Sequence, residues 1–110
     1  MIKETITQIE ERIKEAKSLS GAKKAELLDL LSALKTEVSE LSDTHAEHTR
    51  SIAGFTDISV HEAIREEKNP QLLKISLEGL STSVEGFESS HPKLVGIVNS
   101  ICHILSNIGI

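Results

Sequence analysis

Apolar residues recur along this chain at alternating spacings of four and three, which is how a helix presents one buried stripe. Segments with this rhythm lie at about residues 2–18, 21–53, 59–68, 70–89 and 92–108. Each stripe is narrow, so each helix needs other helices to pack against. The pattern predicts an all-α fold, an antiparallel helical bundle of coiled-coil-like helices that forms a single domain over residues 1–110.

The second segment is the longest. Its stripe runs through Leu27, Leu31, Leu34, Val38 and Leu41 and continues in the same rhythm through His45, His48, Ile52 and Phe55. One unbroken helix from about residue 22 to 53 would be about 48 Å long. A break is the alternative, because residues 42–44 favour helix caps and Thr44 with Glu47 forms a capping box. The unbroken rhythm favours one long second helix.

Capping residues mark several helix starts. Ser20 fits the N-cap of the second helix. Ser59 with Glu62 forms a capping box for a short helix that ends near residue 68. The last two helices are predicted to begin at X-Pro pairs, in which proline takes the first helical position, at Asn69–Pro70 and His91–Pro92.

Small residues form a second stripe beside the leucines of the fourth segment, at Ser76, Gly79, Ser83, Gly86 and Ser90. A glycine inside a helix costs about 1 kcal/mol relative to alanine. Close approach of another helix backbone would offset this cost, and a weak solvent-facing side is the alternative. At the end of the chain, Gly109 fits the left-handed residue of a Schellman cap, with Ile110 folding back onto Leu105.

Composition and charge limit the kinds of core, partner and cellular location that we expect for this protein. Only two residues are aromatic, Phe55 and Phe87, so the core is expected to be aliphatic. The net charge of −5 argues against nucleic acid, whose phosphates attract Lys and Arg. We expect no membrane segment and a cytoplasmic location, because the chain has neither a long apolar run nor a signal-peptide pattern. A single cysteine, Cys102, cannot form an internal disulfide.

The long second helix is expected to extend beyond any bundle that the shorter first helix can complete. A second copy of the chain is the simplest cover for the apolar stripe that this leaves exposed. We therefore expect a homodimer or a higher homo-oligomer.

His45 and His48 are the most interesting candidate site. Both occupy core-type positions one turn apart, where two imidazoles can bind one metal ion and a two-fold partner can complete the ligand set. Two histidines tolerated as polar residues in a loosely packed seam are the more ordinary interpretation. A third is a pH-sensitive seam, because protonated imidazoles that face each other repel.

The remaining chemistry-bearing residues give weaker signals. His91 follows Ser90 at a helix start, where capping is more common than catalysis. His61 and His103 have no partner at helical spacing, and Cys102 lies in an apolar stripe as a small hydrophobe. No nucleotide-binding loop, paired cysteines or HExxH helix is present. We expect no enzyme activity and no cofactor.

The C-terminal third carries two specific patterns. They are Phe87-Glu88-x-Ser90-His91-Pro92-x-Leu94 and Leu105-Ser106-Asn107-x-Gly109-Ile110. With these patterns the chain resembles a family of small bacterial helical proteins catalogued as domain of unknown function 4404. The resemblance implies a helical fold and a bacterial, cytosolic origin, and it implies no chemistry.

The leading functional hypothesis is a self-associating structural or interaction module that also offers a helical surface to an unknown protein partner. The alternative is a metal- or pH-responsive sensor that uses His45 and His48.

Overall fold

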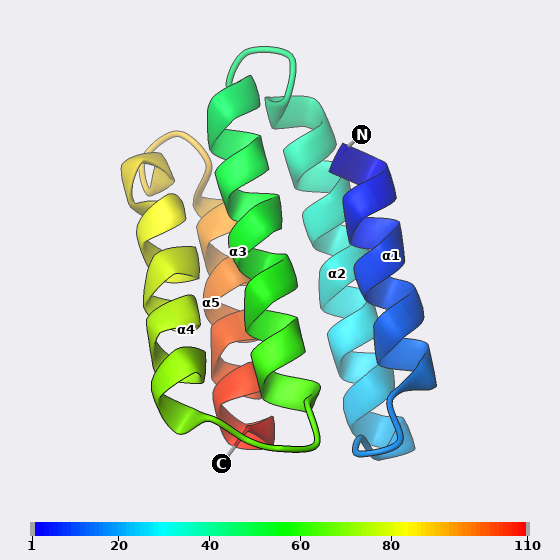
Figure 1. Ribbon diagram of the computed structural model, residues 1–110. Helices are drawn as coiled ribbons and strands as arrows, with labels where there is room; N and C mark the ends of the chain where they lie inside the picture. The colour runs from blue at the N-terminus through cyan, green and yellow to red at the C-terminus, as the bar shows by residue number, and fades with distance from the viewer. Residues whose placement is uncertain (1, 110) are drawn as a thin grey trace.

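The computed structural model describes residues 2–109 and shows a bundle of helices. They are α1 (Ile2–Glu15), α2 (Gly21–Leu41), α3 (Ala46–Ile64), α4 (Pro70–Ser83) and α5 (Pro92–Ile108), with a short 3-10 helix, η1 (Glu85–Phe87), before α5. Successive α-helices run in opposite directions (Figure 1). Residues 2–109 contain no strand, so the predicted all-α antiparallel bundle is confirmed.

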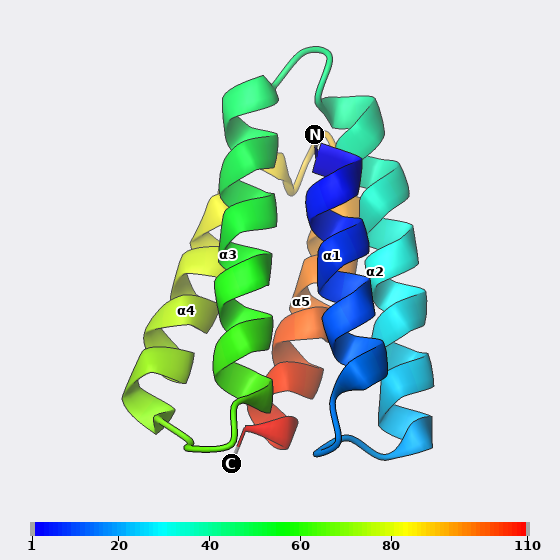
Figure 2. The same ribbon diagram turned by 45° about the vertical axis from the view of Figure 1, so that its right-hand side comes forward.

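The helices close around one core. α1 packs against both α2 and α3, and Figure 2 shows it standing between them. α5 packs against α2, α3 and α4, while α3 and α4 form the most extensive pair and lie side by side in both views (Figures 1 and 2). Within residues 2–109, no helix has the length and apolar character required to cross a bilayer.

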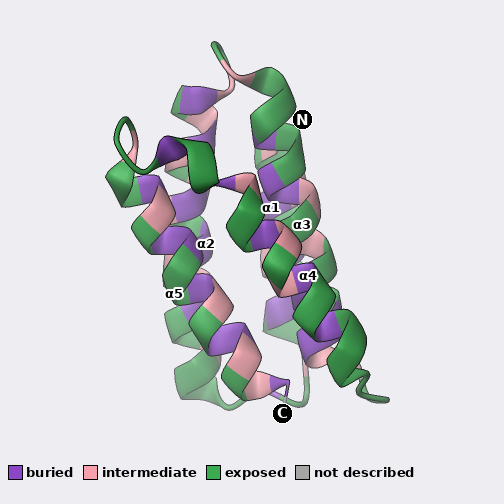
Figure 3. Ribbon diagram, turned by 90° about the vertical axis from the view of Figure 1, so that its left-hand side faces the viewer, coloured by how far each residue is buried: buried purple, intermediate pink, exposed green. Residues whose placement is uncertain are grey.

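The predicted stripes supply this core. Figure 3 shows buried positions recurring along each helix between exposed ones. The most completely buried side chains of α1 and α2 are Ile6, Ile9, Ile13, Leu27, Leu31, Leu34 and Val38, each 0% exposed. Burying one such side chain stabilises a fold by about 1.5–3 kcal/mol. The narrow stripes are therefore covered by other helices of the same chain.

The prediction of one long second helix is wrong. α2 ends at Leu41, and the chain turns over residues 42–45 before α3 begins. The hydroxyl of Ser42 donates to the carbonyl of Ser39 at 2.9 Å, and His45 has a non-helical backbone with φ −136° and ψ 54°. The molecule's longest extent is 37 Å, so a helix of about 48 Å would project beyond it. The rhythm of apolar residues survives because the turn returns α3 to the same core.

The predicted helix end near residue 53 and the new helix over 59–68 are also wrong. α3 continues through Gly54 to Ile64 without a break. Contacts along its length stabilise the continuous helix, including an ion pair between Asp57 and Arg12 of α1. Ser59 and Glu62 are therefore buried in mid-helix and form no capping box.

The other helices begin and end closer to the positions predicted from the sequence. Ser20 accepts a hydrogen bond from the Lys23 amide at 3.2 Å, and Asn69 accepts one from the Leu72 amide at 3.1 Å, so both predicted N-caps are confirmed. α1 stops at Glu15, three residues before its predicted end, and α4 stops at Ser83. The chain after α4 tightens into η1, which ends two residues short of the predicted helix end at 89.

The predicted left-handed cap at Gly109 is wrong, because this residue has φ −82°. Close packing explains a glycine here instead: a Cβ would lie 2.2 Å from Cδ2 of Leu73. The predicted contact of Ile110 with Leu105 falls outside the described residues.

Candidate functional site

Three histidine rings surround the ring of Phe87 at one end of the bundle. The centroids of His45, His48 and His91 lie 5.5, 5.4 and 5.5 Å from that of Phe87, each in an edge-to-face arrangement. His45 also lies 5.9 Å from His48 and 6.4 Å from His91. Phe87 is buried, whereas His45 and His91 are half-buried and His48 is exposed. These four residues are termed the histidine cluster.

His45 and His91 occupy equivalent places in the fold. Each is the N-cap of a helix, α3 or α5, and their backbone angles agree closely, at φ −136° and ψ 54° against φ −137° and ψ 62°. Each Nδ1 contacts the hydroxyl of the preceding residue, Thr44 at 2.8 Å and Ser90 at 2.9 Å. The sequence analysis missed His91 as a member of this group. The shared hydroxyl–histidine–helix pattern was the signal available for it.

Phe87 occupies the space that the three imidazoles face. Among residues 2–109, no three His, Cys, Asp or Glu side chains are placed to hold a metal ion together. A metal ion bound by His45 and His48 would therefore require ligands from outside the chain. The arrangement instead brings three imidazole rings from the starts of two helices onto one buried aromatic ring.

A second feature is an apolar face on α3 and α4. Four large hydrophobic residues are exposed among those described: Phe55 (37%), Ile58 (49%), Leu72 (42%) and Ile75 (54%). On each helix the two residues are three positions apart and so lie on the same side. Scattered exposed hydrophobics are common on protein surfaces, but these four are confined to one helix pair.

Gly79 brings α3 and α4 together beneath this face. A Cβ at Gly79 would lie 2.3 Å from Cε1 of Phe55, so the aromatic ring rests directly on the α4 backbone. Because the helices are antiparallel, this contact places Ile58 beside Ile75 about one turn further along the seam. At Gly79 the nearest atoms all belong to the Phe55 side chain, so this glycine accommodates an aromatic ring and not the helix backbone that was predicted, whereas at Gly86 a Cβ would have no neighbour within 4 Å.

Charged side chains lie on both helices of this pair. Arg65 Nη1 lies 2.8 Å from Glu62 Oε1 at the end of α3. Lys74 and Glu78 are exposed on α4, where they line a groove toward α5 together with Leu77 and Cys102. The whole chain carries a net charge of −5.

The family assignment covers both features. The model of a family described as domain of unknown function (DUF4404) matches residues 30–110. This chain belongs to the DUF4404 family. The matched range begins within α2 and contains the histidine cluster and the apolar face. No curated protein and no solved structure matches the chain.

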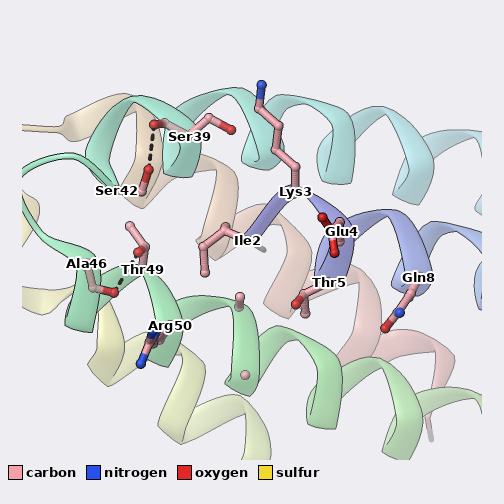
Figure 4. Close-up of a pocket in the computed structure, with 12 residues that line it drawn as sticks. Ile2, Lys3, Glu4, Thr5, Gln8, Ser39, Ser42, Ala46, Thr49 and Arg50 are labelled. Carbon is pink, nitrogen blue, oxygen red and sulfur yellow. Dashed lines mark hydrogen bonds between the residues drawn. The ribbon is translucent and has the colours of Figure 1, made fainter.

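This DUF4404 member also has an open cleft of about 970 Å³ where α1, the end of α2 and the start of α3 meet (Figure 4). Its hydroxyls bond to the backbone: Ser42 donates to the Ser39 carbonyl, and Thr49 to the Ala46 carbonyl at 2.8 Å. Figure 4 shows Lys3 extending away from α3. The lining also includes Glu4, Gln8 and Arg50, so polar and charged side chains outnumber apolar ones around the cleft.

The other candidate residues are not brought together. His61 and His103 are exposed on separate helices, and His103 lies near Asn107 alone, at 3.4 Å. Cys102 is half-buried, and burial raises the pKa of its thiol above the ordinary value. A raised thiol pKa leaves little of the nucleophilic thiolate at neutral pH.

Proposed function

We propose that this DUF4404 member is a helical interaction module that associates with a second copy of itself through the apolar face. The observation that carries the proposal is the confinement of every exposed large hydrophobic residue among residues 2–109 to α3 and α4. Exposed apolar patches bordered by polar residues are typical of protein-binding surfaces. The proposed role is binding, and it requires no catalytic group.

The structural reason for proposing a dimer differs from the reason that the sequence offered. The sequence prediction relied on a long second helix with an uncovered apolar stripe. In the structure α2 is covered within the chain, with Leu41 only 2% exposed. Self-association therefore rests on α3 and α4 instead of on α2.

A second copy suits the apolar face because a two-fold interface brings the same patch from both copies together. Phe55, Ile58, Leu72 and Ile75 of one copy would then be covered by the same four residues of the other. Copies of a chain with net charge −5 repel one another at a distance, and this repulsion opposes association.

The association is expected to be weak. Four half-exposed side chains from each copy contribute on the order of 8 kcal/mol of apolar burial. The loss of translational and rotational freedom offsets about half of this. We expect a dissociation constant on the order of 1 mM, so concentrations between about 0.1 and 2 mM bracket the transition.

Sedimentation equilibrium tests the proposal. The wild-type chain should shift from monomer toward dimer as its concentration rises through this range, and Ile58→Glu should remain monomeric. Ala25→Glu provides the control, because Ala25 is exposed on α2, away from the apolar face. A wild-type monomer at every concentration, or dimers of Ile58→Glu equal to wild type, would contradict the proposal.

A response to protons is the second candidate function, and the third imidazole at the Phe87 ring favours it. The sequence offered only His45 and His48 for such a role. His91 adds a group from the start of a different helix, so protonation would act on two helix ends together.

A further inference from the structure

We infer that the groove between α4 and α5 binds a dipeptide that has apolar side chains and free termini. The groove lies on a different side of α4 from the apolar face, since Leu77 and Ser81 of its lining are roughly 120–160° around the helix from Ile75. The site therefore goes beyond the proposed self-association and does not depend on it.

The inner surface of this groove is apolar. Pro70, Leu73 and Leu77 of α4 line it together with Cys102 of α5, around a volume of about 480 Å³. The sulfur of Cys102 lies 4.0 Å from the carbonyl oxygen of Leu77, so the two helices meet at the bottom of the groove. A space of this size between bundle helices, mostly apolar with a few polar groups, is typical of small-ligand sites. The groove therefore suits a small ligand with an apolar body.

The rim of the groove carries one charge of each sign. Lys74 and Glu78 both line it from α4, and both are exposed to solvent. Within residues 2–109 neither side chain forms an ion pair. A lysine four residues before a glutamate is also the less favourable order for pairing on a helix. The ammonium and the carboxylate are therefore available to a ligand that carries both opposite charges.

This pair of charges selects the kind of ligand. A fatty acid would match Lys74, but its carboxylate would be repelled by Glu78. A zwitterion places its carboxylate at Lys74 and its ammonium at Glu78 without such repulsion. The hydroxyls of Ser81 and Ser106 also line the groove and form no hydrogen bond with the other described residues, so they are available to a peptide group.

The spacing of the charges favours a dipeptide over a free amino acid. Positions 74 and 78 lie four residues apart in α4, which is about 6 Å along the helix axis. An extended dipeptide spans about 7 Å. A free amino acid, in contrast, carries both charges on one α-carbon. A dipeptide can therefore lie along α4 with a terminus at each charged side chain and its apolar side chains toward Leu77 and Cys102.

An NMR titration of the full chain with leucyl-leucine tests the inference. At about 50 µM the chain is far below the dissociation constant expected for the dimer, so failure here is distinct from failure of the proposed self-association. Amides of residues 73–78 and 102–109 should shift along one saturating curve, with a dissociation constant on the order of 1 mM. Amides of α1, which packs against α2 and α3, should not shift.

Blocked analogues and substitutions then assign each charge. N-acetyl-leucyl-leucine lacks the ammonium and leucyl-leucinamide lacks the carboxylate, so each should bind about threefold more weakly than leucyl-leucine. Lys74→Gln should weaken leucyl-leucine about threefold and leave leucyl-leucinamide unchanged. Glu78→Gln should weaken leucyl-leucine by a similar factor and leave N-acetyl-leucyl-leucine unchanged. Glu88→Gln with Lys93→Gln is the matched control, because it removes two exposed charges outside the groove lining and should bind as the parent does.

Three results would overturn the inference. They are the absence of a saturable shift at the groove, affinities for free leucine or decanoate equal to that for leucyl-leucine, and blocked analogues that bind as tightly as leucyl-leucine. Because Lys74 and Glu78 are exposed, their glutamine variants are expected to fold, and their amide spectra check this directly.

Discussion

Gly79 shows most directly how a single residue shapes the surface of this protein. Its missing side chain lets the Phe55 ring approach the α4 backbone, where a Cβ would stand 2.3 Å from Cε1. Phe55 is 37% exposed, so its ring has room to rotate outward if a methyl group is introduced. An alanine at position 79 would therefore raise the helix propensity of α4 but force the Phe55 ring out of its present position.

Gly79→Ala should change the free energy of unfolding by less than about 0.5 kcal/mol in the wild-type chain, because displacement of Phe55 offsets the gain in helix propensity. In a Phe55→Ala background the same substitution should stabilise by about 0.5–1 kcal/mol. Urea denaturation of the wild type, the two single variants and the double variant gives the coupling free energy between positions 55 and 79. Gly54→Ala is the control, since a Cβ there meets nothing within 4 Å. Equal effects of Gly79→Ala in both backgrounds would show that the contact has no energetic consequence.

The roles of single residues could be predicted where they follow from spacing within one helix. The small-residue stripe identified Gly79 because serines and glycines recur beside the leucines. The stripe gave no means of separating Gly79, which lies in α4 against the Phe55 ring, from Gly86, which lies in η1 and has no neighbour within 4 Å of a Cβ. His91 was missed for the same reason: it meets His45 through folding, across 46 residues of sequence.

At the scale of elements, helix starts were predicted better than helix continuity. Asn69 and Ser20 each accept a hydrogen bond from an amide in the first turn of the following helix, and such bonds depend on only a few adjacent residues. The continuity of α3 goes with burial on both sides of Gly54, at Ile52, Ala53, Thr56 and Val60, which depends on distant helices. Local signals at Gly54 and Ser59 therefore predicted a helix end that tertiary packing removes.

Asn69→Ala should lower the free energy of unfolding by about 1 kcal/mol, because the substitution removes the acceptor of the Leu72 amide. Gln71→Ala, at an exposed position of the same first turn, should change stability by less than about 0.5 kcal/mol. Thermal unfolding followed by circular dichroism measures both variants. A loss in Gln71→Ala as large as that in Asn69→Ala would show that the cap is not the cause.

The α2–α3 turn explains the largest error in the predicted fold. Apolar spacing continues unbroken through residues 42–45, because both helices return to the same core. Spacing alone does not distinguish a straight helix from two helices joined by a turn of compatible length. Residues 42–44 indicated the break, but the predicted capping box of Thr44 with Glu47 does not form. The Thr44 hydroxyl donates to the Leu41 carbonyl, and His45 takes the N-cap position of α3 without a side-chain hydrogen bond.

For the whole molecule, the central prediction that narrow aliphatic stripes bury one another holds within a single chain. The stripes of α1 and α2 are fully covered, so the core leaves no apolar helix side on α2 for a partner. What remains exposed is the apolar face of α3 and α4. Sequence spacing placed Phe55 in a core stripe and gave no reason to single out Ile58 or Ile75 as exposed, because exposure depends on where the other helices lie.

A mixing experiment tests the role of the apolar face most directly. Ile58→Glu and Ile75→Lys place opposite charges at neighbouring positions of that face. Each variant alone should sediment as a monomer at about 1 mM, because association would bury its introduced charge against apolar side chains without a partner. An equimolar mixture should form a heterodimer, because the carboxylate introduced at position 58 of one copy then meets the ammonium introduced at position 75 of the other. A mixture that stays monomeric beside a dimeric wild type, or variants that dimerise alone, would contradict a self-association surface on α3 and α4.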